Sequence, residues 1–164
     1  MDKDVQSSAQ LLQKVPDACF IPYESIRYLR SLEDILPKAI ILYQLNVVGH
    51  FCAIFRNSEG INFFDPLGMI PDDELRYVKP QFRHLNQNYT YLINLLLACK
   101  EPIIYNQYRL QKLGTSTCGP WCVVRLIYSH LKCDEFAKCF KGIKNKDKAV
   151  MTIYKNICTK YRFK

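Results

Sequence analysis

Residues 111–122 read Gln-Lys-Leu-Gly-Thr-Ser-Thr-Cys-Gly-Pro-Trp-Cys, a pattern that indicates the start of a buried helix. Three hydroxyl residues, the expected caps, precede Cys118, and Pro120 falls in the first turn, where its missing N–H costs nothing. Only Arg125 interrupts the apolar surface over the next two turns. A thiol at such a helix start is favoured as the thiolate, so Cys118 is a candidate nucleophile. Gly119 is expected to leave room there for a substrate backbone.

Length and composition predict a single globular domain spanning residues 1–164. The chain is 49% hydrophobic and 23% charged, and it contains no apolar run long enough to span a membrane. Its polar N-terminus lacks the pattern of a secretory signal, so we expect a protein that is not secreted and has no membrane partner. The 8 cysteines are therefore expected to be free thiols in a reducing compartment.

Positive charge is concentrated in the last fifth of the chain. Residues 132–164 hold ten Lys or Arg against three acids, a net +7 of the total +8. Such a segment is typical of nucleic-acid binding, and a solvated basic helix face is the alternative. Helical spacing places Lys144, Lys148 and Lys155 opposite apolar residues that should pack on the body.

Apolar periodicity predicts an α+β fold with a small central sheet packed against the helix of Cys118. Strands are expected at 39–45, 49–55, 61–65 and 102–105, and helices at 5–14, 31–37, from 71, at 89–99, from 118, from 134 and at 147–161. Residues 79–88 fit no pattern.

The second and third expected strands form a hairpin that carries a histidine and a carboxylate. A nucleophilic cysteine needs a base, and His50 begins a strand whereas His130 lies on the nucleophile's own helix, roughly 18 Å along it. With a four-residue turn, His50 lies directly opposite Asp65, which would orient the imidazole; a five-residue turn places the two side chains on opposite faces. The sequence leaves both registers open.

These pieces resemble the adenovirus-type maturation proteases, within the group that includes the ubiquitin-like-protein-specific proteases. The matching motifs are Gly49-His50-Phe51, Asn62-Phe-Phe-Asp65-Pro-Leu-Gly68, and Gln111 seven residues before Cys118-Gly119. They occur in the family's order and cover roughly residues 30–131.

The resemblance implies a viral cysteine endopeptidase that cleaves precursors of structural and core proteins next to glycine. Cys118 would be the nucleophile, His50 the base and later the acid, and Asp65 the group that orients His50, while Gln111 would donate to the oxyanion hole. No cofactor is required for this chemistry; the family implies activation by a viral peptide and by DNA. We expect a monomer in the virion and infected host cell, whose substrates are viral precursor polyproteins and whose basic segment 132–164 binds DNA without sequence preference.

Four alternatives remain. A ubiquitin-like-protein deconjugase shares the fold and chemistry, and a non-catalytic nucleic-acid-binding virion protein would use only the basic segment. A thioredoxin-type redox protein is disfavoured because Cys118 and Cys122 are one residue too far apart for Cys-x-x-Cys. A zinc site of Cys118, Cys122, His130 and Cys133 is disfavoured because the four residues share one helix or its end.

Overall fold

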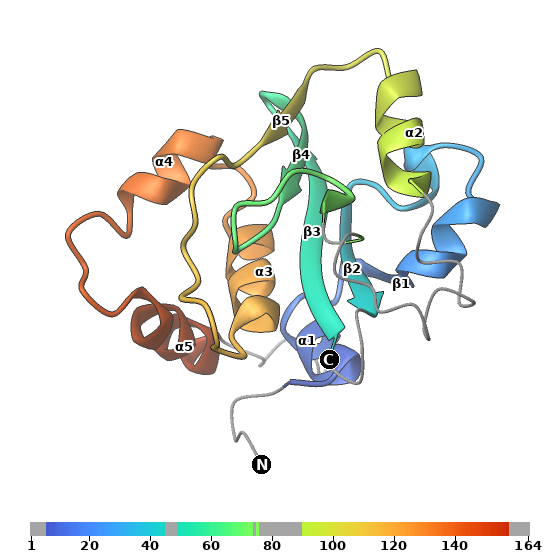
Figure 1. Cartoon of the computed structure of the whole chain (residues 1–164). Helices are drawn as coiled ribbons and strands as arrows, with labels where there is room; N and C mark the ends of the chain where they lie inside the picture. The colour runs from blue at the N-terminus through green and yellow to red at the C-terminus, as the bar shows by residue number, and fades with distance from the viewer. Residues whose placement is uncertain (1–5, 45–48, 74, 76–89, 158–164) are drawn as a thin grey trace.

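The computed structural model describes residues 6–44, 49–73, 75 and 90–157, which adopt the predicted α+β fold. A five-stranded mixed sheet lies at its centre, with the strands in sequence order from β1 to β5 (Figure 1). The helices and strands are α1 (Ser8–Lys14), β1 (Cys19–Pro22), the 3₁₀ helices η1 (Tyr23–Tyr28) and η2 (Leu32–Asp34), β2 (Lys38–Gln44), β3 (Gly49–Asn57), β4 (Gly60–Phe64), α2 (Tyr91–Ala98), β5 (Ile103–Tyr105), α3 (Cys118–Ile127), α4 (Cys133–Lys138) and α5 (Lys146–Asn156).

The strand pairing is antiparallel in the middle of the sheet and parallel at both edges. β3 pairs antiparallel with β2 and with β4, whereas β1 runs parallel to β2 and β5 parallel to β4. Strand β1 was not predicted. Only Ile21 of its four residues is buried, so this edge strand lacks the apolar run by which the central strands were recognised.

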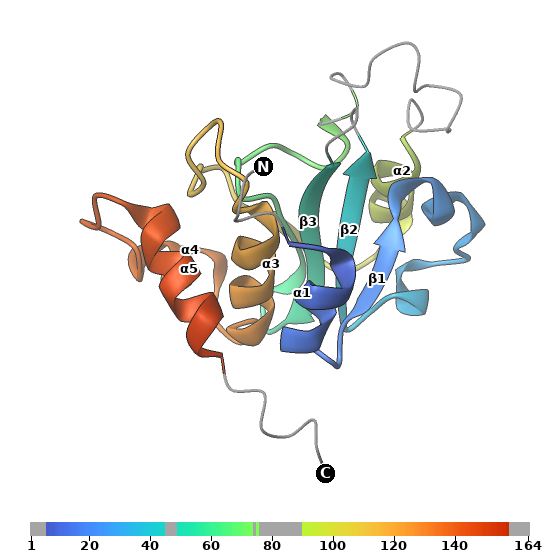
Figure 2. The same ribbon diagram turned by 90° about the horizontal axis from the view of Figure 1, so that it is seen from below.

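Helices cover both faces of the sheet. Figures 1 and 2 show α3 and α1 against one face, with α4 and α5 beyond α3, and α2 with η1 on the other side. The first layer buries Trp121 and Val124 against Phe55, and the second buries Tyr23 and Leu92 on the opposite face. The sheet is therefore shielded on both sides, which explains why its central strands are almost continuously apolar.

The turn of the β3–β4 hairpin is shorter than both turns considered from the sequence. Asn57 pairs with Gly60, leaving a two-residue turn at 58–59, and Gly60 takes a φ of 132° that favours glycine. Both the four-residue and the five-residue turn were wrong. The two-residue turn shifts the pairing by two residues from the four-residue register, so it keeps His50 and Asp65 on one face.

Helix α3 is buried along almost its whole length, as predicted. Arg125 is only 1% exposed, and its guanidinium lies over the rings of Phe55 and Phe136. It donates to the backbone oxygens of Tyr128 and Leu131 at 2.9 and 2.8 Å, beyond the helix C-terminus. The one charge in this apolar helix thus adds a charged donor to carbonyl groups that also accept from the N–H of Leu131 and from Asn57 Nδ2.

The apolar side of α5 packs on the body of the domain as expected, although the bounds of the helix differ. α5 ends at Asn156 within the predicted range 147–161; Val150 is buried while Lys148 and Lys155 are exposed. In α4, Asp134 and Glu135 lie in the first turn, and Glu135 accepts the N–H of Lys132.

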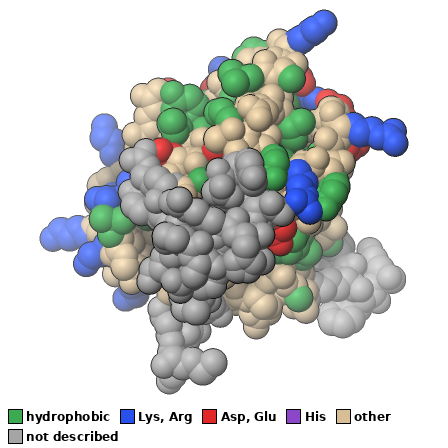
Figure 3. Space-filling view, turned by 45° about the vertical axis from the view of Figure 1, so that its right-hand side comes forward, with side chains coloured by type: hydrophobic (Ala, Val, Ile, Leu, Met, Phe, Trp, Pro, Cys, Tyr) green, Lys and Arg blue, Asp and Glu red, His purple; other side chains and the backbone are tan. Residues whose placement is uncertain are grey.

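On the face shown in Figure 3, Lys and Arg side chains project from separate places around the edge and do not gather in one patch. Every helix in the described part of the chain is too short or too polar to cross a bilayer. Where a helix was predicted from residue 71, residues 71–72 form a turn and residues 73 and 75 are in 3₁₀ conformation, while residues 74 and 76–89, His84 included, lie outside the described residues.

Candidate active site

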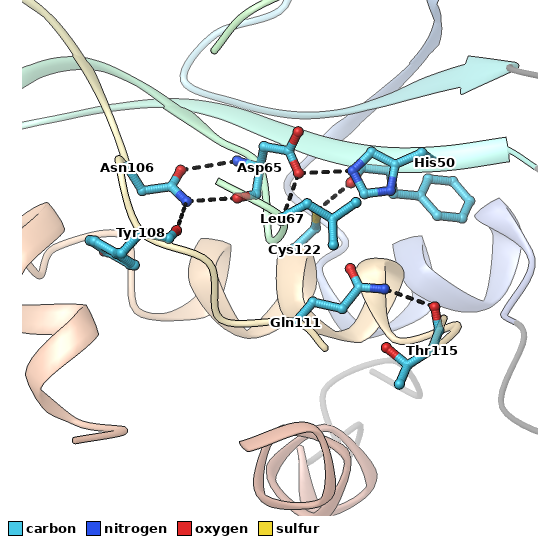
Figure 4. Close-up of polar contacts among 9 residues, drawn as sticks. His50, Asp65, Leu67, Asn106, Tyr108, Gln111, Thr115 and Cys122 are labelled. Atoms are coloured by element: carbon cyan, nitrogen blue, oxygen red, sulfur yellow. Dashed lines mark hydrogen bonds and ion pairs between the residues drawn. The ribbon is translucent and has the colours of Figure 1, made fainter. Parts of the chain in front are cut away.

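The sheet brings His50 and Asp65 into direct contact. His50 lies at the start of β3 and Asp65 directly follows β4, and the His50 Nε2 atom lies 2.8 Å from Asp65 Oδ1 (Figure 4). The two side chains are buried, with Asp65 fully inaccessible and His50 6% exposed. Because Nε2 contacts the carboxylate, the other ring nitrogen, Nδ1, is left to exchange a proton with a reacting group.

The backbone of Asp65 is held by Asn106, which directly follows β5. The backbone N–H of Asp65 donates to Asn106 Oδ1 at 3.1 Å, and Asn106 Nδ2 donates to the Asp65 carbonyl at 2.6 Å (Figure 4). Asp65 Oδ1 also accepts the N–H of Leu67 at 2.8 Å. Asn106 was not predicted; a buried polar residue directly after an apolar strand was the signal that could have identified it.

Cys118 meets His50 from the other side of the site. It is the first residue of α3 and is 9% exposed, and its thiol interacts with the His50 imidazole. Burial lowers the pKa of His50, but hydrogen bonds and charge interactions with Asp65 and Cys118 raise it more, so the pKa is well above its usual value. The charged imidazolium is therefore favoured, as expected of the base in a thiolate–imidazolium pair.

The start of α3 differs from the prediction in two respects. Thr117 occupies the N-cap position, but its side chain makes no cap hydrogen bond, so the predicted hydroxyl cap was wrong. Its hydroxyl donates to Asp147 of α5 at 2.5 Å. At Gly119 an added Cβ would lie 2.9 Å from the side chain of Leu11, so the small residue makes room for α1 and not for the expected substrate.

Gln111 lies beside this helix start, as the motif spacing predicted. Its backbone N–H and that of Leu110 donate to the Pro66 carbonyl at 3.0 and 2.9 Å, which ties the segment to the turn after Asp65. The side-chain Nε2 donates to the Thr115 carbonyl at 2.9 Å, whereas Oε1 is buried without a hydrogen-bond partner. The amide orientation is fixed, because flipping it would place two oxygens against each other.

Two further cysteines lie near the site. Cys122, one turn along α3, is fully buried, and its thiol donates to the Phe51 carbonyl at 3.4 Å. Burial, with the charges of Cys118 and Asp65 added, raises its pKa well above the usual value, so its thiolate is disfavoured. Cys52 shares the face of His50 and was not predicted to lie in the site.

His50, Cys52 and Asp65 each offer a ligand atom, and these atoms lie within 4.8 Å of one another. Imidazole, thiolate and carboxylate are the ligands that zinc prefers. Their closest pair is already joined by a 2.8 Å hydrogen bond, which a metal ion held by both would have to replace. His130, in contrast, is exposed beyond α3, and its ring lies near that of Tyr128, 6.2 Å away.

Fold and site together define an α+β protein in which a buried histidine–carboxylate pair meets a cysteine at a helix N-terminus. The chain is 32% identical over 146 residues to a protein of Sputnik virophage named "Uncharacterized protein V9", covering 84% of this chain and 83% of that protein. It therefore belongs to the same family as that virophage protein and is a viral protein. No protein-family model matches it. Peptidase activity, and a relationship to the adenovirus-type proteases, remain predictions from the sequence.

Proposed function

We propose that the chain is a viral cysteine endopeptidase that processes precursors of viral structural and core proteins, cleaving next to glycine. The observation that carries the proposal is the hydrogen bond between Asp65 and His50, together with the interaction of the Cys118 thiol with the same imidazole. Nucleophile, base and orienting carboxylate in contact are the arrangement that thiol proteases use.

In this mechanism His50 accepts the Cys118 proton, and the Sγ thiolate attacks the scissile carbonyl carbon to form a C–S bond. The N–H of Cys118 and the second N–H of Gln111 Nε2 are the donors for the oxyanion. The C–N bond then breaks as the imidazolium gives its proton to the leaving amine. Water, with His50 as base, hydrolyses the acyl-enzyme, and the proton returns to Sγ.

Labelling tests the nucleophile. A glycine-ending peptide aldehyde or vinyl sulfone should block turnover, the vinyl sulfone modifying Cys118 alone, and Cys118→Ala should abolish both reactions while the fold remains. Incubation with capsid precursors of the same virus should then yield cuts next to glycine. Labelling of several cysteines at similar rates, or none, would contradict an activated nucleophile.

Ubiquitin-like deconjugation is the alternative substrate class, since the same chemistry cleaves after a C-terminal glycine. Parallel assays decide between the two: a glycine-ending ubiquitin-like protein fused to a reporter, and the capsid precursor. Preference for the precursor by kcat/KM supports maturation, and preference for the fusion overturns it.

Nucleic-acid binding through the basic segment is the second proposed activity, and it would stand alone if the chain were a non-catalytic virion protein. It is supported by the exposed Lys144, Lys148 and Lys155 on and beside α5. Phosphate contacts predict an affinity that falls steeply with salt and differs little between DNA sequences. Fluorescence anisotropy with two unrelated duplexes across a salt series tests this, and no binding at low salt would refute it. Adding DNA to the peptidase assay at low salt tests the activation that the family implies.

A further inference from the structure

Asp147, in the first turn of α5, joins three points around the start of α3. Its Oδ1 accepts the Thr117 hydroxyl at 2.5 Å and the Trp121 indole N–H at 3.0 Å. Its Oδ2 accepts the backbone N–H of Lys112 at 3.0 Å. Thr117 directly precedes Cys118, and Lys112 directly follows Gln111. One carboxylate therefore holds both ends of the segment that separates the candidate nucleophile from the candidate oxyanion donor.

Little apolar packing supports this segment from outside. Lys112 and Gly114 are exposed, and a Cβ added at Gly114 would meet no atom within 4 Å. A cavity of about 550 Å³ lies between the segment and α5, lined on the α5 side by Asn145, Lys148 and Lys155. Hydrogen bonds thus help to fix the segment, and those of Asp147 reach it from another helix.

We propose that Asp147 is a positioning residue that fixes Cys118 relative to Gln111. By holding the Thr117 hydroxyl and the N–H of Lys112, Asp147 fixes the residue before Cys118 and the residue after Gln111. The Cys118 N–H and the Gln111 side chain then stay oriented toward the position where an oxyanion develops. The role rests on the proposed peptidase function, and it gives the start of α5 a task unrelated to nucleic acid.

Asp147→Ala should release the segment and lower kcat about 10²-fold, the loss that a displacement of about 1 Å can cause in an oriented site, with little change in KM. The matched control is Asn145→Ala. Asn145 caps the same helix by accepting the N–H of Lys148 at 3.0 Å, a hydrogen bond made at the start of α5 itself. The Asn145→Ala substitution should therefore lower the melting temperature and leave kcat unchanged. Asp147→Asn keeps the size of the side chain and one acceptor oxygen, so its kcat should lie between that of Asp147→Ala and that of the wild type.

A readout independent of turnover comes from Trp121, the single tryptophan of the chain. Its indole N–H gives one resonance, which should move upfield and exchange faster with water in Asp147→Ala but not in Asn145→Ala. A normal kcat in Asp147→Ala, or an equal loss in both variants, would overturn the positioning role and leave the peptidase standing. If the wild type turns over no glycine-containing peptide, the proposed function fails and this role fails with it.

Discussion

Gln111→Ala should separate catalysis from stability. The side chain is proposed to donate one N–H to the oxyanion while the other holds the Thr115 carbonyl at 2.9 Å. An oxyanion donor acts only in the transition state, so its removal should lower kcat about 10²–10³-fold, or about 3–4 kcal/mol, with little change in KM.

The same substitution should have a small effect on folding. It removes one neutral hydrogen bond, which contributes about 1 kcal/mol. It also removes the buried Oε1 that lacks a partner, a defect that costs about 1–3 kcal/mol in the wild type. The two terms have opposite signs, so we expect the free energy of unfolding to change by less than about 2 kcal/mol.

Steady-state kinetics on a glycine-containing peptide and urea denaturation of the same preparations measure both effects. Gln111→Glu is the matched variant: it keeps the size of the side chain but places an acceptor, and at neutral pH a charge, beside the oxyanion. It should be at least as inactive as Gln111→Ala. A rise in KM at unchanged kcat would refute the reasoning and show that Gln111 only lines the substrate groove.

Three other predictions concern the reactivity of the thiols, the buried Arg125 and the titration of His50. Iodoacetamide should modify Cys118 much faster than Cys122, whose thiol is buried and has a raised pKa; comparable rates in the folded protein would contradict the assignment. Arg125→Met should lower the free energy of unfolding by about 3 kcal/mol, because two backbone carbonyls lose a charged donor, and urea denaturation would show it. His50 has a raised folded-state pKa, so its stabilising contribution is full below its unfolded pKa of about 6.5 and is lost as the pH rises through the folded value. His50→Gln should therefore cost most stability near pH 6 and progressively less at higher pH, and a loss independent of pH would refute this.

The parts of the site that were predictable are those encoded by short segments. Cys118, Gly119 and Pro120 lie within one turn before an apolar run, so local propensity alone places the thiol at the start of a buried helix. His50 likewise follows from its place at the beginning of a strand. The places of Cys118 and His50 in the fold can therefore be predicted without knowing which distant residues they contact.

The hairpin register was not predictable, because the sequence between Phe55 and Gly60 fits several turn lengths. The structure uses the two-residue turn, and Asn57 stabilises it by accepting the N–H of Glu59 at 2.9 Å. The register of the four-residue turn and that of the observed two-residue turn differ by an even number of residues. Any even shift keeps the side chains of His50 and Asp65 on one face of the sheet, so their proximity was easier to predict than their exact position opposite each other.

Asn106 and Asp147 were missed because their partners are distant in sequence. Asn106 lies 41 residues beyond Asp65, and Asp147 lies 30 beyond Thr117. Each reads locally as an ordinary polar residue, after a strand or in the first turn of a helix. Only the packing of α5 against α3 shows that Asp147 reaches the Cys118 segment.

Thr117 shows how such a long-range partner reverses a local rule. A threonine directly before a helix normally caps it: its side-chain oxygen accepts a hydrogen bond from an N–H of the first helical turn, because no stronger partner lies nearby. Here a carboxylate at 2.5 Å offers a charge-assisted bond, which is roughly twice as strong as a neutral one, so the hydroxyl donates outward. The helix loses its cap, a cost of about 1 kcal/mol. Because Pro120 has no N–H, the cap could have satisfied only the N–H of Gly119. The bond to Asp147 instead ties the residue before Cys118 to α5, which is what the proposed positioning of the thiol requires.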